Sequence, residues 1–176
     1  MSQGLSGVRE RARKNKHERF TAWLHHVTPQ LLRDSFYALK RKAAPGVDGV
    51  TWKEYETGLE DRLQDLHGRV HRGAYRAMPS KRQWIPKANG KQRPLGMATL
   101  EDKIVQQAVV KVLNEIYEED FRGFSYGFRP GRSPHMALDA LYVAIKRKKV
   151  NWILDLDLKS FYDHISHVKL VQLIEK

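Results

Sequence analysis

The sequence predicts an α/β fold in which short helices surround one β-hairpin and precede a single further strand. Three observations support this prediction. Apolar residues recur at helical spacing through most of the chain, Asn89-Gly90 separates two extended runs, and residues 150–158 alternate between apolar and polar side chains. Because helices and strands do not alternate in a βαβ series, a doubly wound parallel sheet is not expected.

Four helix starts are marked by capping residues. Residues 20–27 carry an apolar stripe, and Thr28 followed by a proline begins a second short helix. After the turn-forming segment 44–51, Thr51 is expected to cap one helix that ends near residue 68. Thr99 and Ser133 are expected to begin the next two helices, the first with an apolar core-facing stripe and the second with Leu138, Leu141 and Ile145 turned inward. A last helix is predicted from residue 166 onward.

The first 19 residues differ from the rest in composition. They are polar and basic and contain two glycines, so they are expected to form a flexible basic arm or a frayed helix that orders on a partner. They lack the apolar core of a signal peptide, and no apolar run in the chain approaches the length of a membrane span. With no cysteine present, the sequence predicts a soluble protein of the cytoplasm that does not bind a membrane.

Charge indicates a polyanionic partner. The chain has 32 Lys and Arg against 20 Asp and Glu, a net charge of +12. Residues 66–100 contain no Asp or Glu but eight cations, which are Arg69, Arg72, Arg76, Lys81, Arg82, Lys87, Lys91 and Arg93. Trp84 and Tyr75 lie among them, a mixture that suits nucleic-acid binding. A solvated basic face is the alternative interpretation of this stretch. For the whole chain, the alternative is a soluble basic protein or a structural binder like those of the ribosome.

Residues 150–158 are predicted to form a strand with one buried face. Asp155 and Asp157 share its other face, and Asp157 stands where a strand end can present a carboxylate to a metal ion. A single aspartate at such a point more often ends a strand or caps a turn. Two-metal phosphoryl transfer requires carboxylates from separate segments, so one strand does not suffice.

Four ordered motifs resemble group II intron reverse transcriptases. The segment from Asp157 to Ile165 is similar to the aspartate-aliphatic-x-x-aromatic-aromatic-aspartate motif of that family. Residues 45–49 resemble its early fingers loop, residues 85–96 its fingertip hairpin, and residues 125–133 its following signature. The resemblance covers residues 20–176 and implies the fold of a right-hand polymerase. Residues 20–149 would be the fingers, and residues 150–176 the first strand and helix of a palm that is cut short.

The resemblance also implies roles for individual residues. Asp157 would be a catalytic, metal-binding aspartate that holds Mg²⁺ in the full-length enzyme, and Leu158 and Tyr162 would meet the incoming nucleotide. Tyr162 would exclude a 2′-hydroxyl, unless it is a core tyrosine. Lys87 and Arg93 would contact the triphosphate, unless they make general RNA-backbone contacts. Template or intron RNA would bind at Arg82, Lys91, Arg129 and Arg132.

The hairpin raises a problem of register. A strict two-residue Asn89-Gly90 turn would pair Lys87 with Gln92 and place Lys87 on the face opposite Arg93. Both side chains can reach one triphosphate only if the loop is longer or bulged. We therefore predict a departure from the two-residue register.

The implied activity is RNA-directed DNA polymerisation on an RNA template with a DNA or RNA primer and deoxynucleoside triphosphates. The family's second catalytic block, Tyr-Ala-Asp-Asp or a close variant, is not found, and the sequence contains no Asp-Asp pair. This chain alone is therefore expected to be inactive. The alternative is a non-catalytic RNA-binding module that assists splicing. Self-association through the unpaired edge of the predicted palm strand is a further expectation.

Overall fold

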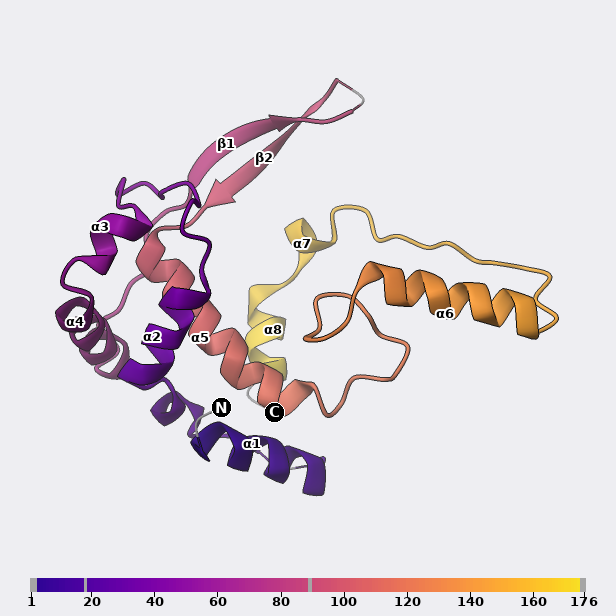
Figure 1. The fold of residues 1–176 in the computed structure, drawn as a ribbon, viewed down its shortest axis with the longest axis horizontal. Coiled ribbons are helices and arrows are strands. Elements are labelled where there is room, and N and C mark those ends of the chain that lie inside the picture. Colours follow the sequence, from indigo (N-terminus) through magenta and orange to yellow (C-terminus); the bar gives the residue numbers. More distant parts are fainter. Residues whose placement is uncertain (1–2, 18, 89, 175–176) are drawn as a thin grey trace. The chain divides into compact units, whose positions relative to one another are not determined.

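The computed structural model describes residues 3–17, 19–88 and 90–174. Its elements are, in chain order, α1 (Gln3–Lys14), the 3₁₀ helix η1 (Trp23–His26), α2 (Pro29–Ala38), α3 (Trp52–Glu56), α4 (Leu59–His71), β1 (Lys81–Pro86), β2 (Gln92–Met97), α5 (Leu100–Tyr117), α6 (Pro134–Arg147), α7 (Phe161–His164) and α8 (His167–Ile174). The chain forms two compact units, residues 1–8 with 22–115 and residues 9–21 with 116–176. Figure 1 shows the elements, and each unit is described by itself.

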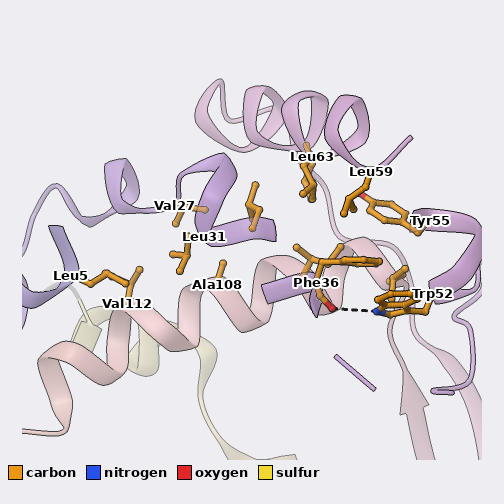
Figure 2. Packing of buried hydrophobic residues seen from close by; sticks show 14 residues of the cluster. Leu5, Val27, Leu31, Phe36, Trp52, Tyr55, Leu59, Leu63, Ala108 and Val112 are labelled. Atoms are coloured by element: carbon orange, nitrogen blue, oxygen red, sulfur yellow. Dashed lines mark hydrogen bonds between the residues drawn. The ribbon is translucent and has the colours of Figure 1, made fainter. Parts of the chain in front are cut away.

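The core of the first unit is built by α2, α3, α4 and α5. On α5 the buried residues Ile104, Ala108 and Val112 follow one another at intervals of four, so they form one stripe along the helix. Helices α2 and α4 add further buried side chains around that stripe (Figure 2), namely Leu31, Leu32, Phe36, Leu59, Leu63 and Leu66. Burying each such aliphatic side chain stabilises the fold by about 1.5–3 kcal/mol. The predicted core helix of residues 100–117 is confirmed.

Trp52 joins α3 to α2. Its indole ring stacks on Phe36 with the centroids 4.5 Å apart and the planes inclined by 15°. The indole N–H donates to the carbonyl oxygen of Phe36 at 3.3 Å, as drawn in Figure 2. A buried tryptophan needs such a partner because an unpaired N–H in a core is costly. The contact therefore fixes α3 beside the end of α2.

The predicted caps are confirmed at all four helix starts, including Thr99, whose hydroxyl oxygen accepts from the Asp102 N–H at 3.2 Å. The Thr28 hydroxyl accepts from the Leu31 N–H at 3.1 Å, and the Ser133 hydroxyl accepts from the Met136 N–H at 3.2 Å. Thr51 forms a capping box with Glu54. One element differs from the prediction: the helix expected from Thr51 to residue 68 is interrupted at Gly58, whose φ of +72° lies in the left-handed region. Two helices, α3 and α4, result.

The basic N-terminal segment is helical. Of the two forms that the sequence allowed, a flexible arm or a helix, the structure has a helix over Gln3–Lys14. Leu5 is buried in the core cluster of the first unit, which gives the segment an apolar attachment. The remaining residues of the predicted arm include residues 1, 2 and 18, which lie outside the described part of the chain.

The second unit presents most of its apolar side chains to solvent. Helix α6 forms as predicted, but Leu138, Leu141 and Ile145 are exposed rather than turned inward. Residues 150–158, all of which the structure describes, form no strand, so that prediction is wrong. A strand is stabilised by pairing with a neighbour, and no described segment pairs with these residues. The alternating pattern therefore persists in an extended loop whose apolar residues are also exposed.

Within the described ranges, no helix combines the length and the apolar character needed to cross a membrane.

Candidate functional site

The hairpin β1–β2 departs from the two-residue register, as predicted. Pro86 pairs with Gln92 and Ile85 with Arg93, so Lys87 faces Lys91. The Lys87 N–H donates to the Lys91 carbonyl oxygen at 2.6 Å, and the Gly90 N–H donates to the Lys87 carbonyl oxygen at 3.0 Å. Gly90 has a φ of +75°, which is typical of a three-residue hairpin loop that closes through a left-handed glycine. Asn89, on which the two-residue turn was predicted, lies outside the described residues.

This register sorts the hairpin cations by face. Lys87 lies two residues after Ile85 and therefore on the same face, and Arg93 lies opposite Ile85. Lys87, Lys91 and Arg93 thus share one face, which we call the Lys87 face. Arg82 and the half-exposed Trp84 lie on the other face. The two predicted RNA-binding residues of the hairpin, Arg82 and Lys91, are therefore on opposite faces.

One cation of residues 66–100, the stretch without Asp or Glu, has acidic partners elsewhere in the chain. Arg69, in α4, donates through Nη2 to both carboxylate oxygens of Glu101 at 2.9 Å and through Nε to Asp65 at 2.7 Å. Arg76 donates to two backbone carbonyl oxygens. The expectation that this stretch faces an external anion therefore does not hold for Arg69, because α5 supplies an acid to it.

Four cations of the hairpin have a different environment. Lys81, Arg82, Lys87 and Arg93 form no salt bridge with any residue in the described part of the chain, and their side chains are exposed. Their charge is available to an external anion. Five of the eight cations of residues 66–100 lie on the hairpin, namely Lys81, Arg82, Lys87, Lys91 and Arg93.

The loop of residues 44–51 packs against the base of the hairpin. A Cβ placed on Gly46 would lie 2.6 Å from Cα and 2.7 Å from N of Thr99, so only a glycine permits this approach of two backbones. Lys103 donates through Nζ to the carbonyl oxygen of Ala44 at 2.9 Å. The loop that resembles the early fingers loop is thereby fixed beside the junction of β2 and α5.

Arg129 has a structural role in the loop of residues 121–132. Its Nη2 and Nε donate to Glu118 at 2.6 and 3.1 Å, and its Nη1 donates to the carbonyl oxygens of Arg122 and Ser125 at 2.8 and 2.9 Å. Only 6% of the side chain is exposed, and the guanidinium lies over the ring of Phe121. All three nitrogens are engaged within the loop, which does not favour the predicted contact of Arg129 with RNA.

Arg132 is less enclosed. Its guanidinium lies over the Tyr126 ring, 5.4 Å from the centroid, and no described acidic residue forms a salt bridge with it. A guanidinium stacked on an aromatic ring keeps its N–H groups at the rim available for a phosphate. Arg132 remains a predicted RNA-binding residue.

The segment from Asp157 to Tyr162 places its side chains in solvent. Asp157, Leu158 and Tyr162 are all exposed, and Tyr162 packs edge-on against Phe161 with the centroids 5.4 Å apart. Ser160, at the start of α7, has a φ of +53°, which turns the chain between Leu158 and Phe161. The described residues contain no group of three or more His, Asp or Glu side chains that would hold a metal ion. Asp157 therefore has no further acidic or histidine side chains gathered around it among the described residues.

Two residues that position the candidate site were not predicted as such. Asp102, in α5, accepts hydrogen bonds from both ends of the hairpin, and Glu118 holds Arg129. The spacing of Thr99 and Asp102 is a helix-start signal, but it does not reveal that Asp102 also binds the residues before β1. The partner of Arg129 follows only from the loop geometry.

Comparisons with known proteins agree with the motifs. A sequence profile of the family described as "Reverse transcriptase (RNA-dependent DNA polymerase)" matches residues 85–176. "Protein YkfC" of Escherichia coli (strain K12) is 38% identical over 135 residues, which is 75% of this chain and 35% of YkfC. "Group II intron-encoded protein LtrA" of Lactococcus lactis subsp. cremoris is 33% identical over 175 residues, which is 95% of this chain and 28% of LtrA.

A third relative matches a shorter part of the chain. "Uncharacterized 91 kDa protein in cob intron" of Schizosaccharomyces pombe is 42% identical over 96 residues, which is 54% of this chain and 12% of that protein. The chain spans about a third or less of the length of these three relatives. Members of the profile family use divalent metal ions. The family predicted from the four motifs is confirmed: this chain belongs to the reverse transcriptase (RNA-dependent DNA polymerase) family, and within it resembles group II intron-encoded proteins.

Proposed function

We propose that this chain forms the nucleotide- and RNA-binding fingers and the beginning of the palm of a group II intron-type reverse transcriptase. The observation that carries the proposal is the shared face of Lys87 and Arg93 on the hairpin. Two cations that form no salt bridge with any described residue share this face and suit the triphosphate of a deoxynucleotide, whose charge increases as the bond to the leaving pyrophosphate breaks. Lys91, opposite Lys87, adds a third positive charge to the same face.

By the family resemblance, Asp157, Leu158 and Tyr162 would also have roles in metal and nucleotide binding. Asp157 offers carboxylate oxygens, the ligand type that Mg²⁺ prefers, and would hold the metal ion together with acidic residues from another segment. The ion would supply charge stabilisation during nucleotidyl transfer. The backbone at Leu158 and the exposed ring of Tyr162 would contact the sugar, where Tyr162 would discriminate against a 2′-hydroxyl.

The other hairpin face supports RNA binding. Arg82 and Trp84 combine a cation with a half-exposed aromatic ring, which suits a phosphate and a stacked base. Arg132, stacked on Tyr126, is the corresponding group of the second unit. The template or intron RNA and its primer would be the partners. The protein would bind this RNA in the cytoplasm.

Primer extension and ligand binding test this proposal together. The 176-residue chain is expected to bind dATP in the presence of Mg²⁺, with weaker binding in Lys87→Gln and Arg93→Gln. It is expected to add no nucleotide to a primer, because its sequence contains no Asp-Asp pair. Mg²⁺-dependent extension by the purified chain would disprove the inactivity. Unchanged dATP affinity in both variants would remove Lys87 and Arg93 from the triphosphate site.

RNA binding by the same chain supplies the test of the alternative, a non-catalytic module that assists splicing. Affinity for structured RNA should fall steeply as salt rises. The logarithm of the affinity should decrease with the logarithm of the salt concentration by a slope of roughly 0.7–0.9 for each phosphate that is neutralised. Arg82→Glu should weaken this binding and leave dATP affinity unchanged, because Arg82 lies on the other face. RNA binding without any dATP binding would favour the splicing module over the polymerase segment.

Self-association is a separate proposal. Residues 150–158 leave Trp152, Leu154 and Leu156 exposed, and two copies joined through them would remove apolar surface from water. Light scattering at increasing protein concentration should then show a dimer that Leu154→Glu abolishes. A mass that stays monomeric across the concentration range would exclude it.

A further inference from the structure

Both ends of the hairpin meet at one carboxylate. Tyr75 and Met78 precede β1, and Thr99 follows β2, so these residues lie where the two strands join the rest of the first unit. The Tyr75 hydroxyl donates to Oδ1 of Asp102. Oδ2 of Asp102 accepts from the Thr99 hydroxyl at 2.7 Å and from the Met78 N–H at 3.3 Å. Three donors from the two sides of the hairpin thus converge on one side chain.

Asp102 is well suited to this position. It is 3% exposed and lies in the first turn of α5, where the helix dipole favours a negative charge. Its own N–H donates to Thr99 Oγ1 at 3.2 Å, so the residue also completes the helix cap. All three partners of the carboxylate are donors, and an ionised carboxylate accepts at both oxygens. An asparagine of the same size would turn an NH₂ group toward at least one of these donors.

The preceding residue fixes α5 itself. Glu101 accepts from Arg69 at 2.9 Å and from the Tyr55 hydroxyl at 3.2 Å, which connects α5 to α4 and α3. Burial, followed by the neighbouring carboxylates, raises the pKa of Tyr55 and Tyr75 above the usual range of a tyrosine, so both hydroxyls stay protonated donors near neutral pH. Glu101 therefore holds α5 to the core, and Asp102 holds the hairpin to α5.

We infer that Asp102 is a positioning residue for the Lys87 face: it sets the direction in which the hairpin carries Lys87 and Arg93. This inference rests on the proposed function, because it assigns a purpose to the position of these two cations. Asp102 acts through the hairpin and does not itself touch the nucleotide. Its loss should release the hairpin while the helical core remains.

The test compares two aspartates in corresponding places. Asp102→Asn removes the buried carboxylate of α5, and Asp61→Asn removes an exposed one from the first turn of α4. Hydrogen exchange of the full chain is expected to be roughly 5- to 30-fold faster for amides of residues 81–97 in Asp102→Asn, the change expected for the net loss of one or two hydrogen bonds. Amides of α2 and α4 should keep their protection, and dATP affinity should fall by a similar factor.

Two substitutions that disturb this site less serve as the test if Asp102→Asn fails to fold. Tyr75→Phe and Thr99→Val each remove one donor, and their effects on hairpin exchange should not add, since both act through Asp102. Hairpin exchange that matches Asp61→Asn in every variant would overturn the inference. If the unaltered chain binds no dATP, the proposed function fails, whereas the exchange measurement still decides whether Asp102 holds the hairpin.

Discussion

Lys87 lies directly opposite Lys91 at the end of the hairpin ladder, joined by a 2.6 Å hydrogen bond from the N–H of Lys87 to the carbonyl oxygen of Lys91. A hairpin one residue tighter would have paired Lys87 with Gln92 and separated it from Arg93. The pairing observed brings Lys87 and Arg93 to the same face instead. A single residue of loop length therefore decides whether two cations can act on one anion.

Exchanging neighbouring residues on β2 tests this arrangement. The double variant Gln92→Arg with Arg93→Gln keeps composition and net charge but moves the guanidinium to the other face, opposite Pro86. Because a triphosphate at Lys87 is then out of reach of the arginine, dATP affinity should fall as far as in Arg93→Gln alone, by roughly tenfold for a lost charged hydrogen bond. Equilibrium dialysis with labelled dATP measures it.

RNA binding is the control for the exchanged variant. The exchange keeps Arg82 and Trp84 and adds a guanidinium to their face, so the slope of RNA affinity against salt should not decrease. If the exchanged variant binds dATP as tightly as the original, the position of the cation on the hairpin does not matter and the shared face has no role in nucleotide binding.

The Arg129–Glu118 pair is expected to stabilise the loop of residues 121–132. Glu118→Gln leaves a guanidinium that is 6% exposed without its charged acceptor, which should cost roughly 1.5–3 kcal/mol of local stability. Limited proteolysis and hydrogen exchange of the loop measure this loss. Asp120→Asn, an exposed carboxylate close by, should have little effect. Equal exchange in both variants would contradict a structural role for Arg129.

Gly46 and Gly7 should respond in opposite directions to alanine. Gly46→Ala forces a Cβ to within 2.6 Å of Thr99 Cα, and because backbone atoms cannot rotate away the variant should lose roughly 1–3 kcal/mol of unfolding free energy. Gly7 lies inside α1, and a Cβ added to it would meet no neighbouring atom within 4 Å, so Gly7→Ala should stabilise that helix by roughly 0.5–1 kcal/mol. Urea unfolding followed by circular dichroism compares them.

Alkaline pH should destabilise the first unit through Tyr55 and Tyr75. Burial, with the nearby Glu101 and Asp102, raises the pKa of both hydroxyls in the folded chain. A raised folded pKa contributes stability that is fully present below the unfolded value of about 10 and is lost above it. The free energy of unfolding should therefore decrease above about pH 10, by at most about 1.4 kcal/mol per pH unit for each tyrosine.

Unfolding of the Tyr55→Phe and Tyr75→Phe variants isolates this effect from the titration of other groups. Each variant should be less stable than the original at neutral pH, since it lacks one hydrogen bond, but should lose less stability between about pH 10 and 11. An identical pH slope in all three proteins would show that the tyrosines ionise equally easily in the folded and unfolded chain.

Local signals in the sequence predicted the local features well. Thr28, Thr51 and Ser133 begin helices because each offers a side-chain oxygen to an unpaired N–H, which depends on residues only three positions away. The hairpin follows equally from local pattern, whereas its longer loop was predicted from the shared role that the resemblance implies for Lys87 and Arg93. The break at Gly58 was missed because the apolar stripe of α3 and α4 continues across it and a single glycine within such a stripe is often tolerated.

Features that depend on distant segments were not predictable in the same way. Arg69 was expected to face an external anion because no acid occurs between residues 66 and 100, yet Glu101 reaches it from α5. The strand expected at residues 150–158 has an alternating pattern but no neighbouring strand among the described residues, and a pattern alone supplies no hydrogen bonds. The roles of Asp157, Leu158 and Tyr162 stay predictions, since they concern a nucleotide and a metal ion.

Because the hairpin is held at its base, a small rotation there displaces its tip by a larger distance. Strands of six residues extend roughly 20 Å, so a rotation of about 5° at Asp102 would displace the tip by about 2 Å. That displacement is larger than the tolerance of a hydrogen bond to a phosphate oxygen. Small changes in packing around Tyr75 and Thr99 would thus shift the positions of the Lys87 and Arg93 side chains by a larger distance.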